Sequence, residues 1–190
     1  MSAERQTEPA GIGVVYEDRL PLAVTVLSGP WEPSQRLRLE QGNVDLLRTL
    51  VALEEVSSDS GGEEEKDPDL QRVEFKVNLV LDMVARLYME HLAIPPLAPV
   101  RLSGEFLEWL DSPCAPAGTW LQVQLYISQR FPQPLILLGT AAAVPADSPY
   151  PCRIRLEGVS QPLQDALERF IFRHHRRLVA YQRRGTGRTG

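Results

Sequence analysis

The chain has 190 residues, enough for one domain with a hydrophobic core or one domain with a large insertion, and too few for two full domains. Hydrophobic residues make up 43% and charged residues 24%, so a chain disordered throughout is excluded. Without a run of eighteen apolar residues, and with the polar start MSAERQTEPAG, neither membrane insertion nor a signal peptide is expected. We therefore expect a cytoplasmic protein.

Two sequence features bear on compartment and partners. The cysteines, Cys114 and Cys152, lack the C-x-x-C spacing of redox or zinc motifs, so we expect reduced thiols and no bridge. The net charge of −5 conceals a basic C-terminus, because seven arginines and no acidic residue follow Glu168. Such an end suits a phosphate ligand or an acidic partner, but helix ends also favour cations, and both interpretations stay open.

The first half of the chain predicts a strand and two helices. Residues 1–19 form a polar N-terminal segment, and the β-rich residues 20–27 predict a strand that ends at Gly29 and Pro30. Asn43 is an N-cap candidate for a helix that ends near Val56. The segment SSDSGGEEEKDP, residues 57–68, has the composition of a flexible acidic linker. The predicted helical insertion covers about 43–93.

The second predicted helix, residues 69–91, carries a heptad seam. Its 3,4 spacing keeps one set of residues in line: Leu70, Val73, Val77, Val80, Val84, Leu87 and His91. Phe75, Leu79 and Met83 lie off this seam, so the helix has two apolar sides. Such a helix is either buried in its own domain or buried between chains, and the short chain favours an intermolecular bundle.

The second half of the chain reads as strands followed by a helix. Alternating residues and Gly or Pro turns predict strands over 99–103, 105–110, 120–127, 134–144 and 152–156. Ser160 is the expected N-cap of a C-terminal helix with Pro162 in its first turn, and residues 185–190 are an expected disordered tail. The fold class is α+β, a small antiparallel barrel or sandwich with added helices.

The sequence contains no catalytic constellation, so we expect no enzyme, no metal and no cofactor. Phosphate-loop, nucleophile-elbow and H-E-x-x-H motifs are absent. His91 stands alone in the seam, and the neighbouring His174 and His175 diverge by about 100° on a helix.

The segment FIFRHHRR is the remaining candidate for binding chemistry. Its helical spacing brings four arginines to one side, where they could meet phosphate or form a solvated cationic face: Arg169, Arg173, Arg176 and Arg177. Nucleic-acid binding is not expected, because the chain is acidic overall and aromatic residues do not interleave with the arginines.

The segments RLEGVSQPLQDALERFIFRHHRR and PVRLSGEFLEWL resemble the PilZ family, and the inserted helices are similar to its atypical, tetrameric subgroup. The resemblance covers residues 20–184. It implies a small antiparallel PilZ-type β-barrel with an inserted helical pair, a homo-oligomer that is a tetramer in the similar subgroup, and cyclic di-GMP as the possible ligand.

The two ligand motifs of that family are broken here. For R-x-x-x-R the chain offers Arg19, with Ala23 at the second position. For D/N-x-S-x-x-G it offers Arg101, Ser103 and Phe106, so that only the serine matches.

Two functions follow. The protein is either a cyclic di-GMP receptor with a non-consensus site, formed by Arg19, Arg101, Ser103 and the four arginines of the FIFRHHRR segment, or a ligand-free oligomeric adaptor for an unknown protein partner.

Overall fold

The structure, a computed structural model, describes residues 14–59, 68–110, 114–128 and 130–186. Six antiparallel strands close a barrel in the order β1-β2-β3-β6-β5-β4. Their bounds are Tyr16–Val26 for β1, Leu97–Leu102 for β2, Phe106–Trp109 for β3, Trp120–Leu125 for β4, Leu135–Ala141 for β5 and Cys152–Leu156 for β6. The predicted antiparallel β-barrel is thereby confirmed.

Strand β1 closes the barrel because it pairs with two neighbours in turn. Its first half pairs with β2, from Tyr16 opposite Leu102 to Pro21 opposite Leu97. Its second half pairs with β4, from Leu22 opposite Leu125 onwards. The strand begins four positions before the predicted start, so Arg19 lies within β1 rather than ahead of it.

The barrel core follows the alternation read from the sequence. On β4, Leu121, Val123 and Leu125 are fully buried while the residues between them are half-buried. Gly139 on β5 lies where a Cβ would collide with the backbone of Arg155 on β6, so no side chain fits at this crossing. Every second residue therefore points into the barrel, and the residues between them point outwards.

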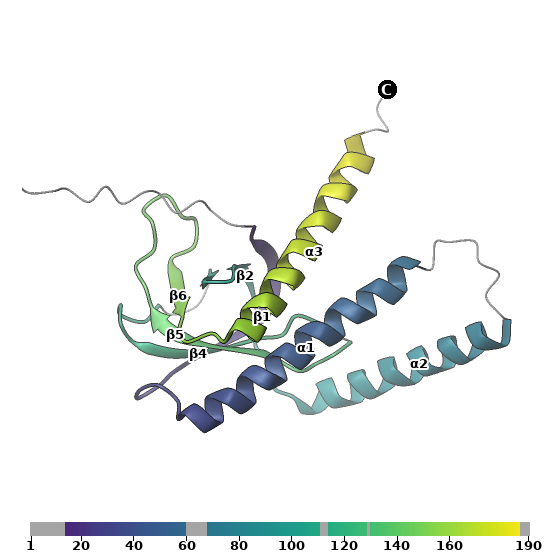
Figure 1. The fold of residues 1–190 in the computed structure, drawn as a ribbon, viewed down its shortest axis with the longest axis horizontal. Helices are drawn as coiled ribbons and strands as arrows, with labels where there is room; N and C mark the ends of the chain where they lie inside the picture. The colour runs from purple at the N-terminus through teal and green to yellow at the C-terminus, as the bar shows by residue number, and fades with distance from the viewer. Residues whose placement is uncertain (1–13, 60–67, 111–113, 129, 187–190) are drawn as a thin grey trace, which may run out of the picture.

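Three helices surround the barrel: α1 (Pro33–Asp59), α2 (Pro68–His91) and α3 (Gln161–Thr186). Helix α1 packs against α3 and β5, and α3 also contacts β1. Both α1 and α3 contribute to the core, with Leu47 on α1 and Leu167 on α3 fully buried. Helix α2 extends away from the barrel (Figure 1).

The predicted start of the first helix was wrong. The helix begins at Pro33, ten residues before Asn43, which is therefore an interior helical residue and not an N-cap. The Asn43 side chain instead pairs with the backbone of Ile136 on β5, donating from Nδ2 to the carbonyl at 2.7 Å and accepting from the amide at 3.0 Å. Proline suits a first helical position because its missing N–H needs no partner there.

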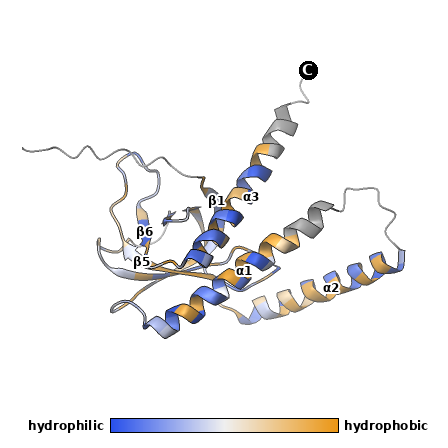
Figure 2. Ribbon diagram, viewed as in Figure 1, coloured by the Kyte–Doolittle hydropathy of each residue, from blue (hydrophilic) through white to orange (hydrophobic). Residues whose placement is uncertain are grey.

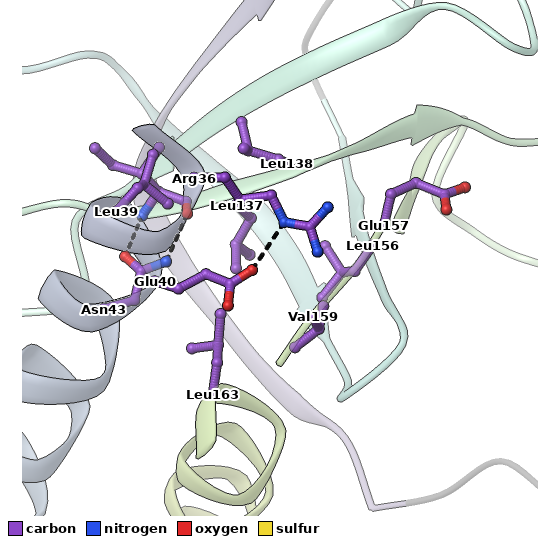
Figure 3. Close-up of a pocket in the computed structure, with 11 residues that line it drawn as sticks. Arg36, Leu39, Glu40, Asn43, Leu137, Leu138, Leu156, Glu157, Val159 and Leu163 are labelled. Carbon is purple, nitrogen blue, oxygen red and sulfur yellow. Dashed lines mark hydrogen bonds and ion pairs between the residues drawn. The ribbon is translucent and has the colours of Figure 1, made fainter. Parts of the chain in front are cut away.

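A second joint holds α1 to the end of the barrel (Figure 3). The Arg36 guanidinium lies 3.0 Å from the nearly buried carboxylate of Glu40 and covers Gly158, where a Cβ would collide with it. Gly158 has a φ of 62°, which glycine adopts without strain. A cavity of about 20 Å³ remains between α1 and β5, room for one water molecule. These contacts lock α1 in place rather than form a ligand site.

The expectation of two reduced cysteines was also wrong. Cys114 and Cys152 form a disulfide, with Cα atoms 5.1 Å apart. Cys152 is buried on β6 and Cys114 is exposed in the segment after β3. Sequence spacing could not reveal this pair, because the barrel brings together residues separated by 38 positions.

The remaining element predictions mostly agree with the structure or fall outside the described residues. Strands β2 to β6 and helix α2 lie where they were expected, and Ser160 directly precedes α3. The predicted linker and tail were placed too wide, because α1 continues to Asp59, α2 begins at Pro68 and α3 continues to Thr186. Their remaining residues, 60–67 and 187–190, lie outside the described part of the chain. Within that part, no helix is long and apolar enough to cross a membrane.

Candidate functional site

Ser103, the one matching residue of the second family motif, shapes the turn between β2 and β3. Its Oγ accepts hydrogen bonds from the backbone amides of Glu105 and Phe106 at 3.1 and 3.0 Å. Only 7% of the residue is exposed. The hydroxyl is therefore committed to its own turn, a common use of serine beside a strand end.

Arg101, two residues earlier, is held by two carboxylates. Its Nε lies 2.6 Å from Oε1 of Glu17 on β1, and its Nη1 lies 3.4 Å from Oε2 of Glu108 on β3. The guanidinium also lies 5.0 Å from the ring centroid of Tyr150, within cation–π range. An incoming phosphate would have to compete with these internal partners for Arg101.

These residues belong to a row that crosses four strands, here called the charge ladder: Glu17, Arg101, Glu108 and Arg153. The barrel register places Glu17 opposite Arg101, Arg101 opposite Glu108, and Glu108 opposite Arg153. Neighbouring charges therefore alternate in sign along the outer face. Opposite charges directly across an antiparallel pair stabilise the sheet.

Glu108 is the centre of the charge ladder. It is fully buried although its side chain belongs to the outer face, and its Oε1 lies 2.7 Å from Nη2 of Arg153. The Ser148 hydroxyl in the loop between β5 and β6 lies 3.4 Å from the same carboxylate oxygen. This loop contributes both Ser148 and Tyr150, so it shields the ladder from water.

Partial burial also changes the pKa of the Tyr150 phenol. Desolvation raises the pKa of its phenol above the ordinary value of 10.0, the Glu17 and Glu108 carboxylates raise it further, and Arg101 partly offsets them. The phenol therefore stays neutral over Arg101 at ordinary pH. The barrel face at the second motif is thus a filled, internally paired surface.

Arg19, the remaining residue of the first motif, lies apart from this network. It is exposed on β1, where its backbone is opposite Pro99. Ala23 at the second motif position faces Gln124 on β4. A single exposed arginine without its partner supplies one phosphate contact at most.

The four predicted arginines of α3 lie along a helix whose first turns contact the β2–β3 turn through Gln164 and Glu168. Arg169 and Arg176 are exposed, whereas Arg173 and Arg177 are half-buried. The Arg176 guanidinium lies 6.0 Å from the Phe172 ring. Gly104, the residue after Ser103, thus meets α3 at a glutamine and a glutamate.

His174 anchors the middle of α3 to the barrel. Its ring lies 4.4 Å from that of Tyr16 on β1 in an edge-on contact, and Phe170 lies 5.2 Å from the same tyrosine. His174 therefore packs as an aromatic residue. Within the described residues, no group of His, Cys, Asp or Glu could hold a metal ion.

The seam residues of α2 are exposed in the single chain. Six of the seven are large hydrophobic side chains exposed by 52–61%: Leu70, Val73, Val77, Val80, Val84 and Leu87. The other apolar side is equally open, with Phe75 exposed by 68%. Figure 2 shows hydrophobic residues along the whole helix. Of the helix, only Ala85 is buried, so the chain itself does not cover either apolar side.

Sequence reasoning missed most of the charge ladder and its cover. Glu17, Glu108 and Arg153 stand at outward positions of alternating strands, which is a visible signal, but their pairing depends on a register that one sequence does not give. Tyr150 lies in a turn-rich loop, and nothing local indicates that this loop folds over β3.

Comparison with known proteins gives two results. The sequence model of the family described as "Atypical PilZ domain, cyclic di-GMP receptor" matches residues 47–184. A solved structure from Xanthomonas campestris, described as a new tetrameric PilZ domain self-assembled via an unusual helical bundle, is similar with 29% sequence identity and a TM-score of 0.71. That match covers 90% of this chain and 93% of the other. No curated protein matches the chain.

Proposed function

The chain belongs to the atypical PilZ domain family, and from this membership we propose that it is a non-catalytic, homo-oligomeric adaptor in cyclic di-GMP signalling. In this proposal the oligomer presents its barrels to a protein partner, and the positions of the two family motifs do not hold the nucleotide. The observation that carries the proposal is the state of Arg101, which is bound by two carboxylates and covered by Tyr150.

The physical argument is one of competition. A phosphate at Arg101 must displace Glu17 or pull the guanidinium from the buried Glu108, and a buried carboxylate that loses its partner is costly. The acidic residues would also repel the ligand's phosphates. Ser103 offers no compensation because its hydroxyl already serves the turn.

Assembly through α2 is the second part of the proposal. The helix exposes apolar side chains on two sides, which a water-soluble chain covers by association. The similar Xanthomonas protein is described as a tetramer assembled through a helical bundle. We therefore propose a homotetramer in which the α2 seams pack against one another.

A nucleotide receptor is the alternative function, and the description of the matching family as a cyclic di-GMP receptor favours it. Its site would use the exposed Arg19 and the α3 arginines, with charge-assisted bonds to the two phosphates. It requires that Arg101 exchange its present partners for the ligand.

Calorimetric titration with cyclic di-GMP decides between the two functions. The adaptor proposal expects no saturable heat with nucleotide up to about 100 μM, a range that includes micromolar complexes. Saturable binding that is lost in Arg19→Ala and Arg101→Ala would establish the receptor instead. Arg38→Ala, an exposed substitution on α1, is the matched control.

A partner assay tests the adaptor directly. The tagged full chain is used to capture proteins from its own cells with and without cyclic di-GMP. The adaptor proposal expects the same specific partner in both samples, and a partner that requires the nucleotide would contradict it.

We also propose a cytoplasmic location, where the expected signalling partners act. The Cys114–Cys152 bridge stands against this location, because disulfides are rare in the reducing cytosol. Immunoblotting of fractionated cells tests it: the protein is expected in the cytoplasmic fraction, and its recovery in an exported fraction would overturn the proposal.

A further inference from the structure

A hollow of about 220 Å³ lies between α1 and α3, outside every position of the family motifs. The two helices diverge towards their C-termini from the place where they pack together (Figure 1). Four apolar side chains line the hollow: Leu47, Val51, Ala52 and Ala166. Because an apolar cavity of about 150 Å³ accepts benzene, this hollow has room for one large apolar side chain.

One arginine from each helix borders the hollow, Arg48 from α1 and Arg169 from α3. Both are exposed. Within the described part of the chain, neither has an ion pair or a hydrogen bond, in contrast to Arg36 and Arg101, which are held by carboxylates. Two unpaired guanidinium groups beside one apolar hollow repel each other, and anionic groups placed near them would relieve that repulsion.

We propose that this hollow binds a segment of the protein partner that carries one large apolar side chain with acidic residues beside it. The apolar side chain would fill the hollow, and the carboxylates would bond to Arg48 and Arg169. This inference rests on the adaptor function proposed above and names the surface that the adaptor uses.

The lining chemistry favours a peptide over a nucleotide. A nucleobase is recognised by polar groups placed against its edges, and the hollow offers leucine, valine and alanine between its two arginines. A groove between two helices with apolar walls and charged edges instead resembles the sites that accept a short amphipathic segment.

The test is a selection from a random peptide library displayed on phage, with the immobilised full-length oligomer as target. We expect enriched sequences that combine a Leu, Ile, Met or Phe with nearby Asp or Glu. An enriched peptide is then synthesised with a fluorescent label, and its affinity is measured by anisotropy for the wild-type chain, for Arg48→Glu and for Arg169→Glu.

Each charge reversal should weaken binding about tenfold or more, since a charge-assisted hydrogen bond is lost and a like charge replaces it. Arg38→Glu, which reverses another exposed arginine of α1 away from the hollow, should bind as the wild type does. Both tested arginines are exposed, and circular dichroism of each variant checks that the fold is retained.

Three results would overturn the proposal: a selection without enrichment, enriched peptides that bind both variants as tightly as the wild type, or release of the peptide by cyclic di-GMP alone, which would assign the hollow to the nucleotide. Failure here is distinguishable from failure of the adaptor function, because capture of a nucleotide-independent partner by the whole chain is measured separately.

Discussion

The carboxylate of Glu108 lies 2.7 Å from Nη2 of Arg153, and it is fully buried on the outer face of a barrel. Outward strand positions usually face water. This pair is buried instead, because the loop between β5 and β6 folds over it. The side chains of Arg153 and Arg101 are exposed by only 22% and 25%. Each strand of the charge ladder is thereby joined to the next by an ion pair.

Removal of the central carboxylate should destabilise the barrel. Glu108→Ala leaves Arg153 without its buried partner, and we expect the free energy of unfolding to fall by about 2–3 kcal/mol. This is slightly less than for a fully buried pair, because both arginines retain some contact with water. Urea unfolding measures the change. Arg155→Ala on the same strand is the control and should cost less than about 0.5 kcal/mol, since its ion pair with Glu157 is exposed.

Tyr150 should make stability fall at alkaline pH. Its pKa is raised in the folded protein, so the contribution to stability is complete below the ordinary value near 10 and is lost as pH rises through the folded pKa. Absorbance of tyrosinate should show that the phenol of Tyr150 ionises later than an exposed tyrosine. Tyr150→Phe should remove this late step, and an unchanged titration would show that another tyrosine is responsible.

Charges in the α2 seam should prevent assembly. We expect the double variant Val77→Asp/Val84→Asp to have a smaller mass by light scattering than the wild type. Assembly would bury the new carboxylates between chains, and burial of each unpaired carboxylate costs on the order of several kcal/mol. Both valines are more than half exposed in the single chain, so the barrel should still fold. Asn78→Asp, off the seam, is the control and should keep its mass. An unchanged mass in the double variant would mean that the seam does not join chains.

The Asn43 side chain should account for much of the stability of the α1–barrel joint. Asn43→Ala removes the hydrogen-bonding partners of the Ile136 backbone amide and carbonyl. Leaving these two groups unsatisfied should lower the free energy of unfolding by about 2–3 kcal/mol. Thermal unfolding compared with the exposed Gln41→Ala gives the measurement. Equal melting temperatures for the two variants would contradict the importance of the joint.

Reduction of the disulfide should lower stability by up to about 4 kcal/mol, because the bridge closes a long loop in the unfolded chain. Cys114→Ser changes only the exposed end of the bridge and should show this loss without a reducing agent. A dithiol reductant should then destabilise the wild type and leave the variant unchanged. If the reductant affects both equally, the bridge does not act through the loop it closes.

The sequence predicted correctly those helices and strands in which apolar residues repeat at regular spacing. Strand β4 alternates because one face fills the barrel, and the heptad repeat of α2 marks apolar residues that the chain itself leaves exposed. The start of α1 was missed because the sequence Gly42–Asn43 resembles a helix start. The Asn43 side chain instead forms hydrogen bonds with the backbone of Ile136, which is 93 residues away in the sequence.

The candidate site was predicted less well for a related reason. Arg101 and Ser103 were found by their resemblance to a motif, but their roles depend on Glu17, Glu108 and Tyr150, which reach them only when the barrel closes. Arg48 and Arg169 border one hollow because two distant helices pack together. Such juxtapositions follow from tertiary structure and leave no periodic signal in the chain.

The double pairing of β1 has a consequence for biosynthesis. This strand leaves the ribosome well before its two neighbours, which begin only at Leu97 and Trp120. Until they emerge, its hydrogen-bonding edges stay open to any other nascent chain. Because closure joins such distant segments, folding should be slow, and a chaperone that shelters the early strand should raise the yield of correctly folded protein.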